Sequence, residues 1–242
     1  MKGTTIAALF ATALAASVVF SLVVPDAPWP TAARDYLAER GFSETGAGNL
    51  VSAVYLGYRA FDTIGETLVL LSALAAAVAL VETARNHDAD GGAVRSAARG
   101  FRRTEIIDLT AGKLAPVVLL LGFYVMLYGH LSPGGGFQGG AVIASGIVFI
   151  ALGRREGGIG RIDPRRRFFS HGSLALAEAI AFTAIMALIA SGAVAGSLFL
   201  ANPLEGGLLP PVAFIIAFNA SIGLKVGSGF ALVCLAMMGD NG

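Results

Sequence analysis

Charged side chains interrupt the long apolar stretches of this 242-residue sequence at a few places. In GYRAFDTIGETLVLL, residues 57–71, Arg59, Asp62 and Glu66 are spaced so that a helix would carry them on one face. An ionisable side chain within a membrane span is costly unless it is paired or hydrated. We therefore expect Arg59 to pair with Asp62, and Glu66 to act as a protonatable relay or as part of a cation path. The alternative is that these charges only hold the helix against a neighbour. Gly57 and Gly65 allow a close helix contact or a local irregularity in the same stretch.

Four further residues are candidates for an ion or proton pathway. Lys225, in FNASIGLKVGSG, is near the middle of the last apolar stretch, so we expect it to face a partner carboxylate or a hydrated cavity, in a functional or inter-subunit role. Glu178 lies about a turn and a half inside its stretch and is a candidate for either relay or helix packing. Lys113 is close enough to a boundary to extend its ammonium into water, which is the favoured interpretation. His130 stands at the end of an apolar stretch, beside a glycine-rich segment.

The composition predicts an all-α, polytopic membrane protein. Hydrophobic residues make up 55% and charged residues only 14%, whereas soluble domains are typically about 25% charged. A membrane span needs about 20 predominantly apolar residues, and backbone groups in lipid must be satisfied within helices. We predict about six spans, at residues 3–24, 62–81, 109–129, 137–152, 174–200 and 211–238. The first could be a signal peptide, but its long apolar core favours a retained helix.

The arginines predict the orientation of these spans. Five lie between residues 82 and 108 and six between residues 153 and 170, whereas the loops on the other side have few or none. Because cytoplasmic loops carry the excess of positive charge, both termini are expected in the cytoplasm. The net charge of +1 gives no basic field for binding nucleic acid. The single cysteine, Cys234, excludes an intrachain disulfide and a multi-cysteine metal site.

Residues 129–140, GHLSPGGGFQGG, place six glycines between two apolar stretches. They formally match the G-x-G-x-x-G pattern of a dinucleotide site, but no strand precedes them and no acidic residue follows at the required distance. The segment instead predicts a tight reversal of the chain. Pro133 cannot continue the preceding helix, Gly134, Gly135 and Gly136 permit unusual backbone angles, and Phe137 begins the next helix. The shortness of that helix indicates that the loop dips into the bilayer.

Two segments carry a resemblance to known families. GHLSPGGGFQGG together with NASIGLKVGSG, residues 219–229, resembles the MnhB/MrpB domain of Mrp-type multisubunit cation/proton antiporters, over about residues 105–242. YRAFDTIGETLVLLSALA, residues 58–75, resembles the two-span module near the carboxyl end of the MrpA protein of these antiporters, which is the separate subunit MbhE in membrane-bound hydrogenases. The expected organisation is a two-span module at 1–90, a cytoplasmic linker at 91–104 and a four-span domain at 105–242.

The resemblance implies a non-catalytic subunit, in the cytoplasmic membrane, of an Mrp-type Na⁺/H⁺ antiporter or a related ion-translocating respiratory complex. Its partners would be other antiporter subunits, with redox subunits in hydrogenase-like complexes, and no cofactor or metal is expected. The carboxylates of Asp62 and Glu66 would lie in a proton-pathway segment, and residues 133–137 would matter for activity. The alternative is a structural scaffold in a redox-driven complex. The sequence leaves open whether sodium moves as well as protons.

Overall fold

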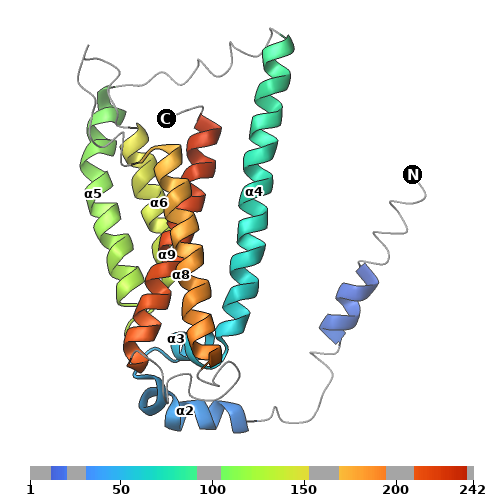
Figure 1. Ribbon diagram of the computed structural model, residues 1–242, viewed down its shortest axis with the longest axis vertical. Helices are drawn as coiled ribbons and strands as arrows, with labels where there is room; N and C mark the ends of the chain where they lie inside the picture. The colour runs from blue at the N-terminus through green and yellow to red at the C-terminus, as the bar shows by residue number, and fades with distance from the viewer. Residues whose placement is uncertain (1–11, 21–30, 92–104, 153–168, 195–209, 239–242) are drawn as a thin grey trace. The chain divides into compact units, whose positions relative to one another are not determined.

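The computed structural model describes residues 12–20, 31–91, 105–152, 169–194 and 210–238, and every regular element in them is helical (Figure 1). This confirms the predicted all-α class. The chain divides into two compact units, residues 1–37 and residues 38–242. Of the first predicted span, the structure describes residues 12–20, which are helical, while the rest lies outside the described residues.

In the described part of the chain, four helices contain apolar stretches long enough to cross a membrane, namely α4 (Ala60–Gly91), α5 (Glu105–Leu127), α8 (His171–Val194) and α9 (Pro211–Met238). A fifth apolar helix, α6 (Gly136–Leu152), has only 17 residues. These five helices coincide with the second to sixth predicted spans, although the end of the fifth, at residues 195–200, lies outside the described residues. The arginine-rich segments that predict orientation fall mainly on residues 92–104 and 153–168, which also lie outside them, so orientation stays a prediction.

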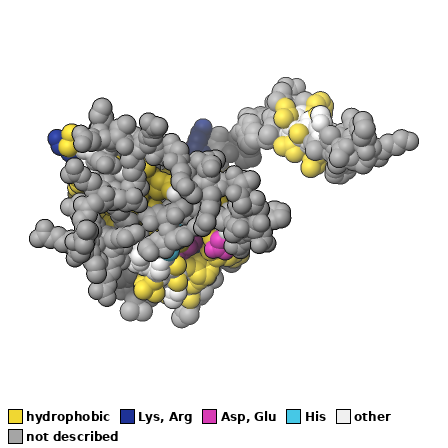
Figure 2. Space-filling view, turned by 90° about the horizontal axis from the view of Figure 1, so that it is seen from above, with side chains coloured by type: hydrophobic (Ala, Val, Ile, Leu, Met, Phe, Trp, Pro, Cys, Tyr) yellow, Lys and Arg dark blue, Asp and Glu magenta, His cyan; other side chains and the backbone are white. Residues whose placement is uncertain are grey.

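Helix α9 is at the centre of this bundle. It is the most buried of the spanning helices, and α4, α6 and α8 all pack against it, while α5 packs mainly on α6 (Figure 1). Apolar side chains from α5, α6, α8 and α9 form one core cluster, which includes Met126, Ile147, Leu174 and Leu235. Among the side chains that Figure 2 colours, hydrophobic ones predominate, and several on α4 and α5 are largely exposed. Such faces suit contact with lipid or with partner subunits.

The segment before α4 contains elements that the sequence did not predict. Helix α2 (Ala32–Thr45) is followed by the short α3 (Leu50–Ser52), which begins where the Asn49 side chain accepts a hydrogen bond from the Val51 amide. A π-helix, η1 (Ala53–Tyr58), then leads to α4. Gly57 lies in this π-helix, and a Cβ atom there would be 3.1 Å from the Thr45 methyl, so Gly57 makes the close contact that the sequence allowed. No atom of the described residues would lie within 4 Å of a Cβ at Gly65.

Candidate functional site

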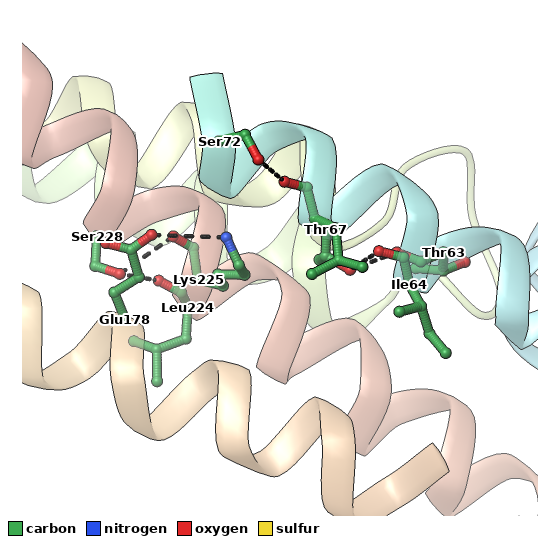
Figure 3. A network of polar contacts seen from close by, with 9 residues as sticks. Thr63, Ile64, Thr67, Ser72, Glu178, Leu224, Lys225 and Ser228 are labelled. Carbon is green, nitrogen blue, oxygen red and sulfur yellow. Dashed lines mark hydrogen bonds and ion pairs between the residues drawn. The ribbon is translucent and has the colours of Figure 1, made fainter. Parts of the chain in front are cut away.

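The structure brings together two of the candidate pathway residues, Lys225 and Glu178. Lys225 is halfway along α9, and its side chain is completely buried, at 0% exposure. Its Nζ atom lies 3.6 Å from Oε1 of Glu178 on α8, whose side chain is 16% exposed. Gly229 makes room for this carboxylate, because a Cβ atom there would be 3.3 Å from Glu178 Oε1. The pair therefore joins α8 to α9 inside the bundle (Figure 3).

This ion pair is loose. At 3.6 Å the two atoms are beyond normal hydrogen-bond distance, and among the described residues neither Lys225 Nζ nor Glu178 Oε1 has a hydrogen-bond partner. Removing charges from water is expensive, and their mutual attraction compensates only when further hydrogen bonds satisfy them. The site thus has unused donors on the ammonium and an unused acceptor on the carboxylate.

Two buried threonines of α4 lie in the bundle interior, and Thr67 is nearer to this pair than Thr63 is (Figure 3). Thr63 and Thr67 are both fully buried, and Figure 3 shows the Lys225 side chain extending from α9 toward the helix that carries Thr67. The Thr67 hydroxyl donates to the carbonyls of Thr63 and Ile64, at 2.5 and 2.9 Å, and the Thr63 hydroxyl donates to the Tyr55 carbonyl at 2.7 Å. Each hydroxyl oxygen still has lone pairs with which it can accept a hydrogen bond.

A second buried polar site lies nearer the start of α9, at Asn219. Its Oδ1 accepts a hydrogen bond from the Gly136 amide at 2.9 Å and another from the Tyr55 hydroxyl at 3.3 Å. The Gly136 amide can only donate, so it fixes which side of the Asn219 amide group is the oxygen. Nδ2 of Asn219 then has no hydrogen-bond partner among the residues that the structure describes, although Asn219 is fully buried. Asn219 thereby ties the first turn of α6 to α9 and to the π-helix.

The glycine-rich segment forms the predicted reversal of the chain. Helix α5 ends at Leu127 and α6 begins at Gly136, with φ angles of +146° at Gly134 and +159° at Gly135. Pro133 is exposed and Phe137 is half-buried. A Cβ atom at Gly136 would be 2.6 Å from the backbone oxygen of Asn219, so the glycine is required for α6 to approach α9 this closely.

Residues 49–52 hold this reversal in place from the other side. The Asn49 side chain donates to the carbonyls of Gly129 and Ser132, at 2.9 and 3.0 Å. The Ser52 hydroxyl also donates to the Gly129 carbonyl, at 2.6 Å, and the Asn49 amide donates to the His130 carbonyl. Four hydrogen bonds therefore connect the segment before α4 to the loop between α5 and α6.

The remaining candidates lie away from the buried pair. Arg59 and Asp62 form the expected ion pair, at 2.5 Å, on an exposed surface. Glu66 is also exposed on α4, and Lys113 is exposed on α5. His130 is half-buried, with Nδ1 2.9 Å from the Leu127 carbonyl.

The negative charge of Glu66 affects the pKa of Tyr55, whose hydroxyl bonds to Asn219. Tyr55 lies in the π-helix, before the apolar stretch of α4 begins at Ala60. Burial raises the pKa of its phenol, a hydrogen bond with Ser52 opposes this rise, and the negative charge of Glu66 adds to it. Glu66 therefore acts on the hydroxyl that contacts Asn219, even though its own side chain faces outward.

Comparison with known proteins places the chain in a family. Residues 106–232 match the domain described as related to the MnhB subunit of Na⁺/H⁺ antiporter. The chain belongs to this MnhB family. An uncharacterised protein of Methanocaldococcus jannaschii is 30% identical over 203 residues, which cover 76% of this chain and 74% of that protein. A probable K⁺/H⁺ antiporter protein of Rhizobium meliloti, named as its combined A/B subunit, is 24% identical over 91% of this chain, which spans only 23% of that protein's length.

A solved structure resembles the MnhB-family chain along nearly its whole length. It is a chain of the membrane-bound sulfane sulfur reductase, an archaeal respiratory membrane complex, with a TM-score of 0.63 and 25% identity. The similarity covers 98% of this chain and 99% of that one. The MnhB-family chain is thus a multi-pass membrane subunit of an Mrp-type antiporter or of a related complex, and its partners are the other subunits of such an assembly.

Sequence reasoning missed several residues of these polar sites, among them Asn49, Tyr55 and Asn219. Asn219 carried a signal, because an amide side chain within an apolar stretch needs hydrogen-bond partners just as a charge does. Asn49 and Tyr55 lie in a stretch of mixed composition, and their roles depend on contacts with residues far along the chain. No local pattern could have identified them.

Proposed function

We propose that this MnhB-family chain is a non-catalytic transport subunit of a multisubunit cation/proton antiporter, or of a related ion-translocating respiratory complex, in the cytoplasmic membrane. Its specific contribution is the carboxylate of Glu66, which α4 supplies to an ion or proton path shared with a partner subunit. The names of the Rhizobium relative and of the sulfane sulfur reductase complex support this class of assembly.

The observation that carries the proposal is the outward position of Glu66. It lies inside the apolar stretch Ala60–Ala84, yet its side chain is exposed and forms no ion pair within the described part of the chain. Asp62, one turn earlier, has Arg59 as its partner. A charged carboxylate that faced lipid would be strongly unfavourable, whereas a partner subunit with a hydrated surface would accommodate it. Glu66 therefore belongs at a subunit boundary where water and protons reach it.

Replacing Glu66 by glutamine tests this role. The Glu66→Gln side chain keeps its size but cannot exchange a proton, so cation-dependent proton exchange should fall to near background while the complex still assembles. Exchange is measured in inside-out membrane vesicles with acridine orange on addition of NaCl or KCl, and assembly on a native gel. Glu82→Gln is the matched control, since Glu82 is another exposed glutamate of α4, close to the end of the apolar stretch. Normal exchange by an assembled Glu66→Gln complex would contradict the proposal.

A structural scaffold in a redox-driven complex is the second candidate. The buried Lys225–Glu178 pair and the close glycine contacts of α6 favour it, because both fix helix packing. A scaffold predicts that charge substitutions lower the amount of assembled complex on the native gel, and that the complex which remains has normal exchange per assembly. For Glu66→Gln, the transport proposal predicts a normal amount of assembled complex and a loss of exchange per assembly.

Co-purification decides which type of assembly contains the chain. A tagged chain is isolated from native membranes in mild detergent, and its partners are identified by mass spectrometry. Antiporter subunits alone would indicate a secondary cation/proton antiporter. Additional iron–sulfur or hydrogenase-like subunits would indicate a redox-driven pump. A chain that is isolated without partners would contradict membership of either type of assembly.

The same proposal includes a two-module organisation. A two-span module at 1–90 is joined through 91–104 to the four-span domain at 105–242. Support comes from the Rhizobium relative, whose name combines the A and B subunits of an antiporter and which aligns with 91% of this chain, and so with both parts. Helix α4 extends to Gly91, so the linker begins where this helix ends.

A further inference from the structure

The buried polar atoms without partners are concentrated along α8 and α9. In the described part of the chain, four buried side-chain atoms lack any hydrogen-bond partner, namely His171 Nδ1, Glu178 Oε1, Asn219 Nδ2 and Lys225 Nζ. The first two are on α8 and the last two on α9, and the Lys225–Glu178 ion pair joins the two helices. Lys225 and Glu178 meet where α8 packs on α9, whereas Asn219 contacts the first turn of α6 and Tyr55 of the π-helix.

Helix geometry gives the extent of this cluster. An α-helix rises about 1.5 Å per residue, so Asn219 lies about 9 Å before Lys225 along α9, and His171 about 10 Å before Glu178 along α8. The two helices run in opposite directions (Figure 1). The four groups therefore extend over about 20 Å of the roughly 30 Å hydrocarbon thickness.

We infer that a line of bound water molecules runs along the buried face of α4, from Asn219 to the Lys225–Glu178 pair, and carries protons inside this subunit. Leaving one buried donor or acceptor unsatisfied costs about 1–3 kcal/mol, and buried waters typically occupy such positions. Water would satisfy Nδ2 of Asn219 at one end and both members of the loose ion pair at the other.

Helix α4 supplies the connection between the two ends. Asn219 and Lys225 are six residues apart, so they point to different sides of α9, and a direct path along one face is absent. Tyr55 reaches the Asn219 side chain, and Thr63 bonds to the Tyr55 carbonyl. Thr67, one turn further along α4, is fully buried on the side toward Lys225. The oxygens of Tyr55, Thr63 and Thr67 can each accept a hydrogen bond from water.

The ion pair can pass a proton without any other reactant. A hydronium ion protonates the Glu178 carboxylate and becomes water, and the neutral carboxyl group no longer holds the ammonium. Lys225 then gives a proton to the next water, which becomes hydronium, and the neutral amine recovers a proton from the Glu178 carboxyl group. One proton has entered and one has left, and the ion pair is restored.

The line does not extend to His171, because Leu174, between His171 and Glu178 on α8, is buried in the apolar core cluster.

Glu66 faces outward and is not a member of this internal line. The water sites of the line follow from the contacts of the chain alone, while its proton transfer rests on the proposed transport function. The experiment therefore needs one measurement of water and another of transport.

X-ray radiolytic footprinting of the intact complex detects the water. Radiolysis of bound water produces hydroxyl radicals that label adjacent side chains, and mass spectrometry measures the rate at each residue. Leu74 is the reporter, because Leu74 and Glu178 both approach Gly229. Leu235 is the matched control, since it is a buried leucine within the apolar core cluster. We expect several-fold faster labelling of Leu74 than of Leu235, and equal rates would overturn the inference.

A paired substitution tests the proton transfer. Glu178→Leu combined with Lys225→Met removes both charges at similar volume, a replacement that usually leaves stability unchanged or increased. The complex should assemble, lose proton exchange and lose the fast labelling of Leu74. Glu178→Gln with Lys225→Gln is the second variant if the apolar pair does not assemble. Normal exchange by either assembled variant would overturn the proton role. If the wild-type complex itself shows no cation-dependent exchange, the proposed function fails, and the labelling of the wild type still decides whether the water line exists.

Discussion

Asn219 holds three elements together through one oxygen atom. Its Oδ1 accepts from the Gly136 amide at 2.9 Å and from the Tyr55 hydroxyl at 3.3 Å. Asn219→Leu keeps the side-chain size but leaves the buried Gly136 amide without an acceptor, so we expect a loss of about 1–3 kcal/mol. Tyr55→Phe should cost about 1 kcal/mol or less, because its hydrogen bond is long and the Gly136 amide keeps its partner.

The midpoint of thermal unfolding measures this difference. Each variant complex is heated in detergent, and the fraction that remains assembled is followed by size-exclusion chromatography. The midpoint should fall clearly for Asn219→Leu and only slightly for Tyr55→Phe. If Tyr55→Phe were the more damaging of the two, the main role of Asn219 as acceptor for α6 would be wrong.

Single residues also show what the sequence could reveal of the site. Lys225 and Glu178 are recognisable from sequence, because a charge within an apolar stretch demands a partner or water. Their pairing is not recognisable, since it depends on how α8 and α9 pack. For Glu66 the position within the bundle could not be predicted. The spacing of Glu66 from Asp62 places both on one helix face, but it does not indicate whether that face lies inside or outside the bundle. Whether these residues carry ions remains a prediction.

At the scale of elements, the glycines of α6 determine how closely it approaches α9. A Cβ atom at Gly136 would be 2.6 Å from the Asn219 backbone oxygen, and one at Gly140 would be 2.7 Å from the Gly223 backbone oxygen. Backbone atoms cannot move aside as a side chain can, so Gly136→Ala should separate the two helices and strongly reduce assembly. Gly65→Ala is the matched control, because nothing lies within 4 Å of a Cβ there.

The two alanine variants are expected to change stability in opposite directions. Alanine is favoured over glycine in a helix by about 0.5–1 kcal/mol, so Gly65→Ala should assemble normally or slightly better. The amount of complex on a native gel and its thermal midpoint provide the comparison. Wild-type assembly of Gly136→Ala would show that the α6–α9 contact tolerates a wider separation than its geometry indicates.

The same scale explains which elements could be predicted. Five of the expected spans coincide with helices, because long uncharged stretches leave a membrane chain no other regular structure. The π-helix Ala53–Tyr58 was not predicted, since one extra residue in a turn changes no local composition. The π-helix depends on contacts with residues outside it. It is packed against Thr45 through Gly57, and it presents Tyr55 to Asn219.

At the scale of the whole molecule, the two proposed modules are held together by contacts that need no peptide link. Asn49 and Ser52 bond to the loop after α5, Tyr55 bonds to Asn219, and α4 packs on α9. We therefore expect a chain divided within residues 92–104, and expressed as two pieces in one cell, to co-purify as a complex.

The divided chain also allows the contribution of Asn49 to the affinity between the two pieces to be measured. Asn49→Ala removes two side-chain hydrogen bonds to the loop, at a cost of about 1–3 kcal/mol, or about five- to 150-fold in affinity between the pieces. In the undivided chain, a short linker keeps the modules at an effective concentration of about millimolar, so the same substitution should leave them assembled. Ser43→Ala is the control, because the exposed Ser43 hydroxyl donates to the Arg40 carbonyl three residues earlier and not to the loop after α5 in the described contacts. Quantitative pull-down of one tagged piece by the other measures the effect. Failure of the unsubstituted pieces to associate would show that the two parts need their covalent link, which would count against two separable modules.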